Sequence, residues 1–89
     1  MKDLARLRLA SLLLDEKAYD DALKQIDAGV TQEFASRFAE LRGDVLVEQS
    51  KLDAAKQAYK QAIEKMPSNA ENNTMKTIVQ TKLDALGGN

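Results

Sequence analysis

The chain has 89 residues, of which 44% are hydrophobic and 30% are charged, and its 13 basic and 14 acidic side chains leave a net charge of −1. This balance gives no electrostatic case for nucleic acid or anionic lipid as a partner. The sequence has no cysteine and no histidine, which excludes disulfides, thiol nucleophiles and the usual zinc ligands. We therefore expect one small domain without enzyme activity, metal or cofactor.

Hydrophobic periodicity predicts five helices and no strand. The first is expected from near Lys2 to Asp15 and the second from Tyr19 to Ala28. Gly29 then follows as a C-terminal residue that tolerates positive φ.

The third helix is predicted to begin after Thr31, a candidate N-cap, with Glu33 placed to favour the helix dipole. Its apolar residues form one continuous stripe, which consists of Phe34, Phe38, Leu41, Val45 and Leu46.

The fourth helix is expected from Leu52 to Met66, where Pro67 ends it because proline has no N–H to continue the helix. A capping box over residues 68–71, with Ser68 as N-cap and Glu71 as its partner, opens the fifth helix. The fifth helix is polar except on one face, and we expect it to cap a stack of helices. That apolar face consists of Met75, Ile78, Val79, Leu83 and Leu86.

Leucines occur around most of the first helix. At 100° per residue, one group can face the second and third helices, and it consists of Leu9, Leu12 and Leu13. The other group falls on the opposite side and consists of Leu4, Leu7 and Leu14. A helix that is apolar on most of its circumference expects neighbours on more than one side. Three explanations stay open: a preceding repeat of a longer solenoid, a homodimer contact, or a binding groove.

The sequence around Ala22 resembles the sequence around Ala55, so the chain repeats itself with a period in the mid-thirties. A period of that size is typical of stacked helical hairpins, which bury their apolar faces only against a neighbour. The chain is therefore expected to be a single domain over residues 1–89. It divides into a first repeat at about 3–31, a second at about 32–67 and a capping helix at about 69–86.

The second hairpin resembles the tetratricopeptide repeat. Five of its residues match positions 8, 20, 24, 27 and 32 of that 34-residue pattern, namely Gly43, Ala55, Tyr59, Ala62 and Pro67. This resemblance implies an all-α fold of two helical hairpins plus the capping helix, a fragment of a right-handed α-solenoid. The small residues would let the helices approach closely, and Tyr59 and Ala62 would pack on the next repeat.

The first hairpin departs from the pattern, because Ala10 replaces the glycine and Ile26 the aromatic residue. The large residue expected at position 4 is also missing in both repeats, where Arg6 and Ala39 stand. These departures suggest a divergent, tetratricopeptide-like family.

Residues 5–10 followed by 22–23, and residues 41–44 followed by 54–56, are similar to the YfgM-like family. The resemblance covers residues 4–86 and implies the C-terminal domain of an ancillary component of the bacterial Sec translocon. In that family a membrane helix, which would lie outside this chain, carries a periplasmic domain that works with a periplasmic chaperone.

In tetratricopeptide domains, partners often lie in a groove lined by the first helix of each repeat. The resemblance implies that this partner-binding groove is formed by Leu4, Leu7, Ser11, Leu14, Arg37, Glu40, Asp44, Val47 and Glu48, with Asp15 beside them. The set is apolar at one end and acidic at the other, so it would repel a C-terminal carboxylate. An apolar segment, or one that carries Lys or Arg, fits better. A solvated acidic face without a partner is the alternative.

Taken together, these patterns predict a protein–protein interaction module without chemistry of its own, whose partners by resemblance are the Sec translocon and a periplasmic chaperone. The full-length protein would be anchored in the inner membrane and face the periplasm. The alternative is a structural segment that oligomerises through the first helix or extends a longer scaffold.

Overall fold

The computed structural model describes residues 2–29, 31–67 and 69–87. Within these ranges the chain contains five α-helices, one 3₁₀ turn at Gln32–Phe34 and no strand, which confirms the predicted all-α class. The α-helices are α1 (Lys2–Asp15), α2 (Tyr19–Asp27), α3 (Ala35–Glu48), α4 (Leu52–Lys65) and α5 (Ala70–Ala85).

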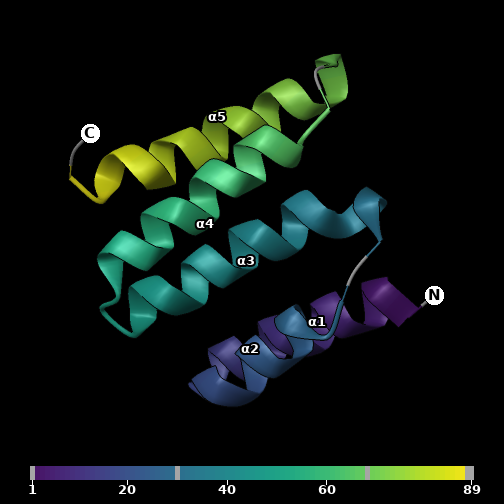
Figure 1. Ribbon diagram of the computed structural model, residues 1–89, viewed down its shortest axis with the longest axis vertical. Coiled ribbons are helices and arrows are strands. Elements are labelled where there is room, and N and C mark those ends of the chain that lie inside the picture. The colour runs from purple at the N-terminus through teal and green to yellow at the C-terminus, as the bar shows by residue number, and fades with distance from the viewer. Residues whose placement is uncertain (1, 30, 68, 88–89) are drawn as a thin grey trace.

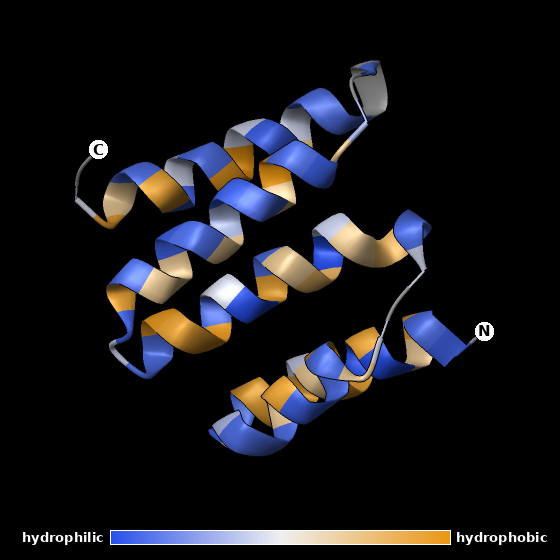
Figure 2. Cartoon of the chain, in the orientation of Figure 1, coloured by the Kyte–Doolittle hydropathy of each residue, from blue (hydrophilic) through white to orange (hydrophobic). Residues whose placement is uncertain are grey.

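The helices stack in chain order as two antiparallel hairpins, α1–α2 and α3–α4, and α5 packs on α4 (Figure 1). The assembly is flat, with extents of 30 × 28 × 17 Å. Hydrophobic residues recur along the helices between hydrophilic ones (Figure 2), as expected where each helix buries one face against its neighbours.

The two hairpin turns have the same geometry and lie one repeat period apart in the sequence. Lys17 and Ser50 both adopt a left-handed conformation with φ of 62°. The amide of the residue after each turn donates to a carbonyl of the preceding helix, from Ala18 to Leu13 and from Lys51 to Leu46, at 2.8 Å in both cases. This is the Schellman pattern, so the repeat seen in the sequence extends to its backbone hydrogen bonds.

Small residues lie where the helices approach most closely. Ala22 and Ala55 are both fully buried. A Cβ added at Gly43 would come closer than 3.0 Å to three atoms of the Tyr59 ring. Tyr59 and Ala62 of α4 in turn pack with Val79 of α5, which confirms the predicted contact with the next element.

The α3 helix buries residues on two sides, against the first hairpin and against α4 and α5. Phe38, Leu41 and Val45 are buried in one cluster with residues of α1 and α2. Leu46 is buried with the alanines of α4, and Ala39 with residues of α4 and α5. The core is therefore continuous from the first hairpin to α5.

Arg6 fills the position where the tetratricopeptide pattern has a large residue. Its guanidinium lies over the Phe38 ring, 5.2 Å from the centroid, and donates to the Gln25 carbonyl at 2.8 Å and to Asp3 at 3.1 Å. A cation at the C-terminal end of α2 also complements the dipole of that helix.

The predicted orientation of α1 is wrong for Leu9 and Leu12 and is confirmed for Leu13. Leu9 and Leu12 are 41% and 54% exposed, whereas Leu7 and Leu14 pack against the core together with Leu13. The leucines alone cannot fix the rotation of this helix, because they occur on both sides. The fully buried Ala10 fixes it, since only a small side chain permits the close approach to Ala22.

Three local details also differ from expectation. Thr31 precedes the 3₁₀ turn rather than α3, and its side chain makes no capping hydrogen bond, since its hydroxyl donates to Asp3 at 2.8 Å. The α5 helix is capped by Asn69, whose side chain accepts from the Asn72 amide at 3.0 Å, while Ser68 lies outside the described residues. Ile78 is 44% exposed and so is not part of the buried face of α5.

The predicted ends of α2 and α4 are confirmed. Gly29 has a φ of 95° directly after the α2 C-cap. Met66, before Pro67, is extended with ψ of 123° and closes α4.

Candidate functional site

A groove runs between α1 and α3 and consists of two adjoining hollows of about 450 and 360 Å³ that share Asp44. The larger hollow lies toward the C-terminal ends of both helices and is lined by Leu14, Asp15, Lys17, Asp44, Val47, Glu48 and Tyr59. The smaller one also reaches α5 and is lined by Leu7, Ser11, Arg37, Glu40, Leu41, Asp44 and Met75. We call these residues together the groove.

The structure brings together every residue predicted for the partner-binding groove except Leu4, which lines neither hollow. Their arrangement differs from the sequence-based picture. The predicted leucines lie on α1 and most of the acids on α3, so one wall is mainly apolar and the other carries most of the acids, next to Leu41 and Val47.

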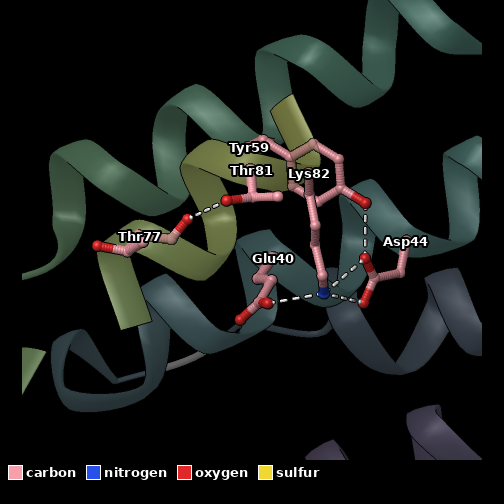
Figure 3. Close-up of polar contacts among 6 residues, drawn as sticks. All are labelled: Glu40, Asp44, Tyr59, Thr77, Thr81 and Lys82. Atoms are coloured by element: carbon pink, nitrogen blue, oxygen red, sulfur yellow. Dashed lines mark hydrogen bonds and ion pairs between the residues drawn. The ribbon is translucent and has the colours of Figure 1, made fainter. Parts of the chain in front are cut away.

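One lysine from α5 contacts two of the acids that line the groove. The Lys82 ammonium donates to Glu40 Oε2 at 2.8 Å and to the two Asp44 oxygens at 3.1 and 3.2 Å (Figure 3). Glu40 and Asp44 are one helical turn apart and therefore lie on the same face of α3. The contact thus ties α5 to α3.

Tyr59 completes this polar cluster from α4. Its hydroxyl donates to Asp44 at 2.6 Å, while its ring covers Gly43 (Figure 3). Burial, the hydrogen bond to Asp44 and the negative charges of Asp44 and Glu40 all raise the pKa of Tyr59 above its ordinary value. Tyr59 therefore stays neutral and acts as a hydrogen-bond donor.

Lys82 stays protonated. Burial alone would lower its pKa, but the hydrogen bonds and negative charges of Glu40 and Asp44 outweigh burial and raise the pKa above the usual value. The cluster has two carboxylates and one ammonium, so it keeps one net negative charge. Both acids already accept hydrogen bonds, so the cluster holds α3, α4 and α5 together.

The C-terminal end of the groove has unpaired acids. Among the residues that the structure describes, none forms an ion pair or hydrogen bond with the side chain of Asp15 or Glu48. Lys17 lies on the rim of the same hollow. At the other end, Arg37 lies over the Phe34 ring, 5.8 Å from its centroid. The groove is thus basic at one end and acidic at the other.

The contribution of α5 was not predicted, although the repeat contains the signal. Lys82 follows Glu48 by one repeat period, just as Glu48 follows Asp15, so the three hold the same place in α1, α3 and α5. Continuing the repeat past Pro67 would have given Lys82 the same position in the pattern as these two groove acids. No group of three or more metal-ligating side chains occurs within the described ranges.

The fold and the groove define a helical-repeat module of the tetratricopeptide type, a class that binds other proteins. The tetratricopeptide repeat-like domain family matches residues 1–88, and the chain belongs to this family. The chain is 41% identical over 83 residues to the "ancillary SecYEG translocon subunit" of Neisseria gonorrhoeae. That match covers 93% of this chain and 38% of the relative's length, and it confirms the resemblance to the YfgM-like family. No solved structure gives a significant match.

Proposed function

We propose that this domain binds a segment of a partner protein in the groove, as part of an accessory protein of the bacterial Sec translocon. The module has no catalytic role in this proposal. Its partners are the translocon and a periplasmic chaperone, and an anchor outside this chain holds the full-length protein to the inner membrane with the domain facing the periplasm.

The similarity to the gonococcal translocon subunit supports the translocon as the partner. The groove supports this face of the domain as the binding surface. Two adjoining hollows with one apolar and one acidic wall provide both contact area and polar anchors for an extended or helical segment. Within the described residues no helix has the length and apolar character needed to cross a bilayer.

Photocrosslinking to purified SecYEG tests this proposal. A photoreactive amino acid is placed at Ser11 in the groove and, as the control, at Lys60, an exposed residue of α4 that lines neither hollow. We expect covalent adducts with a SecYEG subunit from position 11 and few from position 60. Equal adducts from both positions, or none from position 11, would contradict the proposal.

A scaffold role is the second candidate, because Leu9 and Leu12 are exposed side by side on one face of α1. These two leucines, rather than Leu4, Leu7 and Leu14, would form such an interface. Sedimentation at several concentrations separates the two roles. Self-association that disappears in Leu12→Ser would support the scaffold, whereas a monomer at every concentration would count against it.

A further inference from the structure

We infer that the C-terminal end of the groove recognises a lysine or arginine side chain flanked by apolar residues in the partner segment, with Asp15 and Glu48 as its anchors. This inference rests on the proposed function, because it names what the groove selects in its partner.

Charge in the larger hollow supports a cationic group. Its lining contains Asp15, Asp44 and Glu48 against the single cation Lys17. Of the three acids, Asp44 is already bound by Lys82 and Tyr59. Asp15 and Glu48 remain, and a cation placed between the two helices would be attracted by both.

The molecule itself shows how such a cation is held. Lys82 places its ammonium between Glu40 and Asp44, which are one turn apart on α3. Glu48 is the next residue in the same row, a further turn along the helix. A second cation beside Glu48 would therefore repeat the contact that Lys82 makes, with Asp15 of α1 taking the place of the second acid.

Apolar side chains lie beside these acids, so we expect apolar residues next to the lysine or arginine of the partner segment. Leu14, Val47 and the Tyr59 ring line the same hollow of about 450 Å³, which lies in the range of small-ligand sites. They can cover the methylene stem of a lysine or arginine and an adjacent leucine. A carboxylate would instead meet two unpaired negative charges.

The test uses three peptides of one length, acetylated and amidated, in which two leucines flank a central Arg, Gln or Glu on each side. Binding is followed by amide chemical shifts of the domain. We expect the Arg peptide to bind about fivefold more tightly than the Gln peptide, the effect of two partly exposed ion pairs, and the Glu peptide to bind most weakly. Shifts should centre on the residues around Leu14 and Glu48.

The variant Asp15→Asn/Glu48→Gln should abolish the preference for Arg over Gln while the Gln peptide still binds. The matched control is Asp53→Asn/Glu64→Gln, which removes two exposed acids of α4 outside the groove and should keep the preference. Added salt should reduce the preference in the native domain.

The outcomes separate the two proposals. If no peptide shifts the groove residues, binding of a short segment in the groove fails, and this inference fails with it. If Arg and Gln peptides bind equally, groove binding stands and the cation preference is overturned. If the preference persists in Asp15→Asn/Glu48→Gln, the anchors are misassigned and the inference is overturned.

Discussion

At Gly43 the lack of a side chain is required by the packing of the neighbouring helix. The Tyr59 ring lies where a Cβ on Gly43 would be, and its hydroxyl is bound to Asp44. We expect Gly43→Ala to destabilise the domain by about 1–3 kcal/mol in urea unfolding, because the ring must move. In a Tyr59→Ala background the same change should instead stabilise by about 1 kcal/mol, since alanine favours the helix. A loss of equal size in both backgrounds would contradict this account.

Lys17 and Ser50 are strained for the opposite reason, because each carries a side chain at a φ of 62° that favours glycine. We expect Ser50→Gly to raise the free energy of unfolding by about 0.5–1 kcal/mol, after the larger entropy of the unfolded glycine chain is subtracted. Ser50→Ala is the control and should give no gain. Thermal unfolding of the two variants decides, and an equal change in both would remove strain as the cause.

Among the elements, α1 is tied by one carboxylate to the residue before the 3₁₀ turn that leads into α3. Asp3 accepts from the Thr31 amide at 2.9 Å and from its hydroxyl at 2.8 Å. These hydrogen bonds, first from the backbone and then from the side chain, lower the pKa of Asp3, and the charge of Arg6 adds to the effect. A carboxyl whose pKa is depressed in the folded state stabilises that state above its unfolded pKa of about 4 and loses this contribution as the pH falls.

We therefore expect the native domain to lose stability more steeply than Asp3→Asn between about pH 4 and pH 2, the range below the ordinary pKa of aspartate. Urea unfolding at several pH values measures the difference. Asp53→Asn, at an exposed position of α4, serves as the control and should leave the slope unchanged. Parallel slopes for the native domain and Asp3→Asn would show that the contact with Thr31 carries no stability.

The sequence predicted the repeat but not the rotation of its first helix. Small residues reveal the hairpins because close helix contacts admit nothing larger, and Gly43 and Ala55 lie in such contacts. Leucine placement is less informative, because a leucine can be half-buried at many angles. Only Ala10 marks the buried side of α1, and its signal is weaker than that of the leucines around it.

The site was predictable only within the two hairpins. Residues on α1 and α3 follow from the repeat spacing, whereas Lys82 stands on a helix that was interpreted only as a polar cap. The repeat spacing gives Lys82 the same position as Asp15 and Glu48, but it does not show that Lys82 pairs with two acids of α3. Such pairing depends on how α5 packs, and it becomes visible only when the helices are placed in space.

For the whole molecule, the important feature is that both hairpins bury residues of α3. Phe38 is buried in the cluster that joins it to α1 and α2. We expect Phe38→Ala to cost about 3–5 kcal/mol, a large part of the roughly 4–13 kcal/mol expected for a domain of this length. Unfolding should remain a single transition, because the core is shared.

Phe34→Ala is the control for this change, since Phe34 is only partly buried against the same cluster and should cost less. Urea unfolding gives the free energy of unfolding of both variants, and amide hydrogen exchange gives the protection of each helix. If Phe38→Ala released α1 and α2 while α3 to α5 kept their protection, the two hairpins would be independent units.

Because the first hairpin packs on α3, it can also be exchanged between two copies of the molecule. A single stretch of chain joins it to the remainder, and the surface it covers on α3 is identical in every copy. The first hairpin of one molecule therefore fits a second molecule as well as its own, and high protein concentration favours reciprocal exchange into intertwined pairs. Such pairs would keep every helix contact described above while doubling the mass.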